Sequence, residues 1–146
     1  KSIQFGYVSR MDSIQAAILN YRLMKLDDVI SKRRVNAQFY FNNLNSNYIK
    51  LPVEKEHEFN TYHTFTIQIY KRDALSYHLK ENDIKTAIHY SIPIHLQPAA
   101  SKLGYKKGDF PMAEHQSDQI LSLPIHQYLT ETDLKLIVKT VNGFFD

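Results

Sequence analysis

The chain of 146 residues contains no cysteine and only four glycines. The absence of cysteine excludes disulfides, thiolate zinc sites and cysteine nucleophiles, and it suits a cytoplasmic protein. Four glycines are too few for a glycine-rich phosphate cradle, and neither a P-loop nor a GxGxxG motif occurs. No apolar run approaches the roughly 20 residues that cross a bilayer, so we expect no membrane span. Any chemistry of this protein therefore rests on other side chains.

The composition is that of a folded globular protein, with 43% apolar and 23% charged residues. The formal net charge of +3 suits an anionic ligand such as a phosphate ester. The densest basic cluster, residues 32–34, is typical of a solvated helix face, and no Lys/Arg stripe follows it. We therefore expect no nucleic-acid partner. The 18 Tyr and Phe residues fit a small packed core better than a base-stacking surface.

The apolar periodicity predicts an α+β fold. A long N-terminal helix is expected over residues 9–45, with any break after Lys32. Period-2 alternation predicts a strand over residues 62–70, which places His63 on the buried face. Further strands are expected over 86–96 and 120–125, and a Thr-x-x-Asp box predicts that the last helix opens at Thr130. Together these elements predict a small three- to four-stranded, mainly antiparallel sheet with helices packed on one face.

Residues 89–98, HYSIPIHLQP, combine polar and apolar side chains in an unusual way. The stretch fits an extended segment, but Pro93 cannot donate to a ladder, so the segment is an edge or leaves the sheet there. His89 and His95 are therefore either core histidines or part of the rim of a site. No HExxH motif and no nearby carboxylate accompany them, so we expect no metal centre. Residue patterns alone indicate an α+β domain with an anion-binding rim.

Three stretches of the sequence resemble the sugar aminotransferases of the DegT/DnrJ/EryC1/StrS family. Residues 6–19 (GYVSRMDSIQAAIL) match a Gly-x-Asn-x-Arg-Met/Leu pattern that leads into Gln-Ala-Ala. Residues 88–99 (IHYSIPIHLQPA) match His-Tyr-x-x-Pro-x-His. Residues 108–130 match an acidic helix that leads into Leu-Ser-Leu-Pro. The three occur in the family's order and span nearly the whole chain.

The resemblance implies a fold and a place in a larger enzyme. It covers only the C-terminal part of these proteins, so residues 1–146 are expected to form one small domain of a pyridoxal phosphate (PLP) enzyme. Within it, residues 1–45 would be a linker and long helix that bridges to a large domain. That large domain carries the Schiff-base lysine in the family, and no lysine of this chain is assigned to the role. No catalytic residue is expected here, and the fragment alone is expected to be inactive.

The resemblance also implies a reaction, partners and site residues. The family moves an amino group, usually from glutamate, to a nucleotide-linked keto sugar, in polysaccharide or deoxyamino-sugar synthesis, and its members are homodimers. Arg10 matches an arginine that reaches the partner subunit's site, where it could hold a carboxylate or phosphate. His95 matches a histidine that faces the sugar-nucleotide pocket, and His89 and Tyr90 are expected to support the same rim.

One position departs from the family pattern. Val8 stands where the family has an asparagine that contacts the cofactor phosphate of the neighbouring subunit. Valine cannot donate that hydrogen bond, whose loss would cost about 1–3 kcal/mol of phosphate binding. Which residues of this chain would bind the cofactor is thus left open. A non-catalytic sugar-nucleotide sensor or regulator of the same family is the alternative function.

Overall fold

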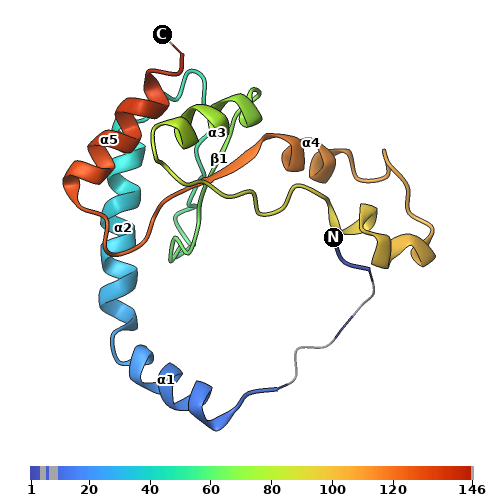
Figure 1. Cartoon of the computed structure of the whole chain (residues 1–146), viewed down its shortest axis with the longest axis horizontal. Helices are drawn as coiled ribbons and strands as arrows, with labels where there is room; N and C mark the ends of the chain where they lie inside the picture. The colour runs from blue at the N-terminus through green and yellow to red at the C-terminus, as the bar shows by residue number, and fades with distance from the viewer. Residues whose placement is uncertain (4–5, 7–9, 146) are drawn as a thin grey trace.

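The computed structural model describes residues 1–3, 6 and 10–145. It confirms an α+β architecture, in which α-helices, two short strands and two 3₁₀ segments alternate along the chain (Figure 1). No helix in this described part is long and apolar enough to cross a membrane. The elements are α1 (Ser13–Leu23), α2 (Leu26–Asn43), β1 (Phe65–Gln68), α3 (Arg72–Glu81), η1 (Ile94–Leu96), η2 (Pro98–Leu103), α4 (Pro111–Gln119), β2 (Ile120–Leu123) and α5 (Glu131–Asn142).

The sheet is smaller than predicted. Strands β1 and β2 pair antiparallel, with Phe65 opposite Leu123 at one end and Gln68 opposite Ile120 at the other. Two other segments make only single bridges: residue 50 pairs with β1, and residue 87, from the segment predicted to be a strand over 86–96, pairs with β2. The sheet thus has two strands flanked by two bridged segments, where three or four strands were expected.

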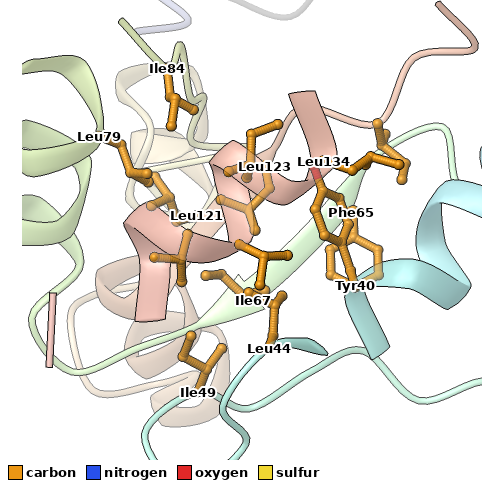
Figure 2. Packing of buried hydrophobic residues seen from close by; sticks show 14 of the residues in the cluster. Tyr40, Leu44, Ile49, Phe65, Ile67, Leu79, Ile84, Leu121, Leu123 and Leu134 are labelled. Atoms are coloured by element: carbon orange, nitrogen blue, oxygen red, sulfur yellow. The ribbon is translucent and has the colours of Figure 1, made fainter. Parts of the chain in front are cut away.

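One face of the sheet builds the core. Phe65, Ile67 and Leu121 are fully buried in it, and Figure 2 shows them packed with side chains from the surrounding helices. α2 contributes Tyr40, whose ring lies 4.9 Å from that of Phe65 and whose hydroxyl donates to the Pro124 carbonyl at 2.7 Å. The same cluster includes, from α3 and α5, Leu75, Leu79, Leu134, Ile137, Val138 and Val141.

The long N-terminal helix is two helices. α1 ends at Leu23 and α2 begins at Leu26, because Lys25 leaves helical geometry at φ −112° and ψ 7°. The prediction of a break after Lys32 was wrong, since α2 runs through that residue. A signal for the true break is present in the sequence: Asp27 and Asp28 occupy the first turn of α2, where acidic groups are favoured by the helix dipole. The predicted start at Ser9 lies outside the described residues, as does Val8.

α1 stands apart from the core. Figure 1 shows it extending away from the other helices, and none of its residues is buried. Its apolar side chains lie exposed on the surface, as do the neighbouring Met24 and Leu26. The exposed large side chains of the helix are Ile14, Ile18, Leu19, Tyr21 and Leu23.

Two local predictions need correction. The strand predicted over residues 86–96 is reduced to its bridge at Ala87, and the chain turns at residues 89–90. Pro93 has no N–H to donate to a strand partner, and its carbonyl instead accepts from Leu96 N at 3.0 Å, which closes η1. His63 is exposed rather than buried. Tyr62, at φ 46°, is itself buried, so the regular alternation starts only at β1. The last helix, by contrast, opens at Thr130 with the predicted capping box.

Candidate functional site

The opposite face of the sheet forms the floor of a pocket of about 700 Å³. Thr66 and Gln68 of β1 point to this side, because strand residues alternate between the two faces. The walls come from residues 89–95, η2, the loop before α4 and α4 itself. Apolar side chains make up much of the lining, as is common for ligand pockets. The polar residues that line it are Thr66, Gln68, His89, Tyr90, His95, Tyr105, Gln116 and Ser117.

His95 is held against the wall of the pocket by an acidic partner. Its Nε2 lies 2.9 Å from Oε1 of Glu114, and both side chains are largely buried, at 8% and 13% exposed. The centre of the Phe110 ring lies 4.8 Å from the centre of the imidazole. Since η1 carries the histidine and α4 carries the carboxylate, this pair fixes two elements that are far apart in sequence.

Glu114 also binds the loop that precedes its own helix. The Gly108 amide donates to both carboxylate oxygens, at 2.8 and 3.0 Å, and the Phe110 amide donates at 3.4 Å. These contacts, chiefly the Gly108 amide and then His95, lower the pKa of Glu114, although partial desolvation opposes them. The carboxylate is therefore ionised near neutral pH, and the hydrogen between it and His95 is donated by the ring.

His89 belongs to a second polar chain at the pocket floor. Its Nδ1 lies 3.1 Å from Oγ of Ser122, and that oxygen lies 3.0 Å from Oγ1 of Thr66 across the strand pair. Ser122 and Thr66 are opposite each other in the β1–β2 register. The sheet thus orients the His89 ring through Ser122, although His89 as a whole is exposed.

Aromatic side chains frame the pocket. Tyr90 is 73% exposed, and its ring meets that of His89 edge-on at 5.5 Å. Tyr105 and Phe110 make a similar edge contact at 5.2 Å. Such rings offer flat apolar surface, with the phenol hydroxyls able to donate or accept a hydrogen bond.

The fourth predicted site residue does not join this pocket. Arg10 is exposed, with 88% of its side chain accessible, and it pairs with Asp12 at 3.1 Å. It does not line the pocket that His89, Tyr90 and His95 share. The structure therefore brings three of the four predicted residues together.

A second hollow, of about 860 Å³, lies between α2 and residues 52–62. Two of its charged lining residues, Arg34 and Glu54, are already paired with each other. Arg34 donates to Glu54 at 2.8 Å and to the Asn60 carbonyl at 2.7 Å, and Tyr62 donates to Glu54 at 2.9 Å. The contacts with Arg34 and Asn60 lower the pKa of Glu54 to about 2. This cluster ties a loop to α2, so we place the candidate site at the first pocket.

Comparison with known proteins agrees with these features. A model of the DegT/DnrJ/EryC1/StrS aminotransferase family matches residues 1–142. The chain belongs to this family. Members of the DegT/DnrJ/EryC1/StrS family are also its structural neighbours: an aminotransferase of this family from Brucella abortus covers 92% of the chain with a TM-score of 0.83 and 34% identity. DesV of S. venezuelae, solved in complex with a ketimine intermediate, covers 92% of the chain with a TM-score of 0.88 and 34% identity.

Curated relatives in the family carry two kinds of name. The chain is 37% identical over 143 residues to the pleiotropic regulatory protein of Geobacillus stearothermophilus. It is 34% identical over 139 residues to the dTDP-3-amino-3,6-dideoxy-alpha-D-galactopyranose transaminase of Aneurinibacillus thermoaerophilus. These alignments cover 96% and 95% of the chain but only 38% of each relative. The chain thus spans little more than a third of the length of these relatives.

The pocket by itself does not fit PLP, the cofactor implied by the family resemblance. A Schiff base needs a lysine amine, and a phosphate ester is usually held by cations or clustered N–H groups. Among the residues that the structure describes, none of those lining the pocket is a lysine or an arginine. We therefore assign no cofactor contact to this pocket.

Sequence reasoning missed several residues of the site. Glu114 lies within the third family-like stretch, and its place in the first turn of a helix that opens with Pro111 was a usable signal. Thr66 and Ser122 gave no such signal, because their pairing with His89 depends on the register of two strands more than 50 residues apart. Phe110 was likewise not singled out, although it packs directly on the His95 ring.

Proposed function

We propose that this chain is the C-terminal domain of a PLP-dependent sugar aminotransferase and that its pocket faces the nucleotide-linked sugar. The observation that carries the proposal is the convergence of His89, Tyr90 and His95 on one pocket in a member of this family. The histidine ring nitrogens and the Tyr90 hydroxyl can form hydrogen bonds with the many hydroxyls of a sugar, and the aromatic rings can pack on an apolar face of the sugar or the base. Several relatives are named as transaminases of nucleotide-linked amino sugars.

The reaction would be transfer of an amino group, with glutamate as the donor, to a keto sugar linked to a nucleoside diphosphate. The cofactor and its lysine would belong to the remainder of a longer protein, since the pocket described here supplies neither a lysine nor a phosphate-binding cation. This chain would bind and orient the sugar. We expect it to have no transaminase activity by itself. The product would serve deoxyamino-sugar or cell-surface polysaccharide synthesis.

The exposed α1 supports the proposed larger assembly. A helix with five large apolar side chains on its surface and no buried residue is unusual for a free-standing domain. We propose that α1 packs against the large domain or the second subunit of a homodimer. Arg10, just before this helix and exposed, would then reach the neighbouring subunit's site, where a guanidinium could bind a carboxylate or phosphate.

The proposal is tested by supplying the longer protein with PLP, glutamate and nucleotide-linked keto sugars. Mass spectrometry should detect the corresponding amino sugar. Borohydride reduction followed by peptide mapping should place the pyridoxyl adduct on a lysine outside these 146 residues. An adduct on one of the lysines of this chain would contradict the proposal that the Schiff-base lysine belongs to another part of the longer protein.

The alternative is a non-catalytic regulator, a role suggested by the name of one relative. It predicts that nucleotide sugars bind but that no amino sugar forms and no lysine adduct appears. The several relatives named as sugar transaminases favour the enzyme.

A further inference from the structure

We propose that Glu114 is a positioning residue that holds the hydrogen of the neutral His95 ring on Nε2, so that the bare Nδ1 faces the sugar. This inference rests on the proposed function, because it assigns a role within the same pocket. His95 lines the pocket, and within the described part of the chain only its Nε2 has a hydrogen-bond partner. That partner is the Glu114 carboxylate at 2.9 Å.

The carboxylate is itself held in place. Gly108 N donates to both of its oxygens and Phe110 N to one, so the group cannot swing away without breaking several contacts. Phe110 also packs its ring against the imidazole at 4.8 Å. Both partners of the pair are therefore fixed: the carboxylate by the loop amides and the ring by its aromatic neighbour.

This geometry dictates the tautomer of His95. An ionised carboxylate can only accept hydrogen bonds, so the Nε2 that faces Glu114 must carry a hydrogen. The neutral ring then has a bare Nδ1, which is an acceptor. A sugar hydroxyl can donate to that atom, whereas a phosphate oxygen cannot. Glu114 thereby makes neutral His95 selective for a hydroxyl of the sugar, while a diphosphate oxygen would pair only with the protonated ring.

Nuclear magnetic resonance of the histidine ring tests this with Glu114 intact. The longer protein that carries this chain is labelled with ¹⁵N-histidine, and His95 is assigned by its loss in His95→Gln. At a pH at which the ring is neutral, we expect the ¹⁵N shifts to show a protonated Nε2 and an unprotonated Nδ1. The opposite tautomer would overturn the proposal even if every Glu114 variant failed to fold.

Glu114→Ala provides the second test, with Glu114→Gln as the conservative variant. In Glu114→Gln the carbonyl can take the place of Oε1, which accepts from His95, Gly108 and Phe110, so the wild-type tautomer should be retained. Glu114→Ala removes the acceptor, so the neutral ring exchanges between its two tautomers and the ¹⁵N shifts should report the average. The KM for the nucleotide sugar should rise about tenfold, as the loss of one positioned hydrogen bond implies.

Asp118→Ala is the matched control, since it removes an exposed carboxylate one turn further along α4. It should leave both the tautomer and the KM unchanged. A Glu114→Ala protein with the wild-type tautomer and a KM within about twofold of wild type would overturn the positioning role. If instead the tautomer exchanges as expected but the wild-type protein binds no nucleotide sugar, the proposed function fails, and with it the ligand assigned to Nδ1.

Discussion

The two faces of the β1–β2 sheet differ in what their side chains contact. On one face Phe65, Ile67 and Leu121 are fully buried among helices. On the other, Thr66 pairs with Ser122 and through it with His89, beside an open pocket. The two sets alternate along the same four-residue strands, so one rigid element serves both the core and the site. Substitutions on one face should change stability, and substitutions on the other should change binding.

The largest effect is expected for Phe65→Ala on the core face. This ring is fully buried and contacts the aromatic rings of Tyr40 and Phe41. Its removal leaves a cavity and should lower the free energy of unfolding by about 3–5 kcal/mol. Urea denaturation of the 146-residue chain measures the loss. A loss below about 1 kcal/mol would mean that this face is not the core.

The second-largest effect on stability is expected at the hydrogen bond between Tyr62 and Glu54, at the edge of the core, and it depends on pH. Tyr62 is buried in the core cluster, and its hydroxyl donates to Glu54, whose pKa is lowered to about 2 by Arg34 and Asn60. Because the folded state favours ionised Glu54, its stabilisation is fully present above pH about 4.5 and is lost as the pH falls toward about 2.

Glu54→Gln should therefore lower stability at neutral pH and flatten the decline of stability between pH about 4.5 and about 2. Unfolding measured across this range by circular dichroism checks the slope. Glu56→Gln, an exposed acid in the same loop, serves as the control and should leave the slope unchanged. Equal slopes for the wild-type protein and Glu54→Gln would show that this carboxylate does not hold the loop.

The smallest effect on stability is expected for Thr66→Val on the pocket face. The change keeps the side-chain shape but removes the hydrogen bond to Ser122, so the free energy of unfolding should fall by about 1 kcal/mol or less. In the longer protein the KM for the nucleotide sugar should rise, because His89 loses the fixed orientation of its Ser122 partner. Steady-state kinetics and denaturation of the same variant separate the two effects. A large loss of stability with an unchanged KM would reverse the assignment of the two faces.

The sequence alone predicted features that depend on neighbouring residues and missed features that depend on contacts between residues far apart in the chain. The opening of α5 at Thr130 was predictable because a capping box is local, and the buried positions of β1 followed from alternation. The break near Lys25 was missed, since no glycine or proline marks it and only Asp27 and Asp28 signal a new start. His63 was misplaced, because the positive φ of Tyr62 falls just before the strand and nothing in the pattern announces it.

For the site, the family-like motif predicted roles for His89, Tyr90 and His95, and the structure places these three residues around one pocket. It could not identify Glu114 as the partner of His95, because that contact joins residues 19 positions apart across a loop. Nor could it identify the Ser122–Thr66 support, which spans 56 positions. Long-range pairs of this kind depend on the fold and not on local spacing.

The most direct test of the account is a crystal structure of the longer protein with a nucleotide-linked amino sugar bound. We predict that the sugar lies in the pocket between β1 and α4, with a hydroxyl in hydrogen-bonding distance of Nδ1 of His95 and the Glu114 contact to Nε2 retained. A sugar nucleotide bound elsewhere, with this pocket filled only by water, would contradict the account.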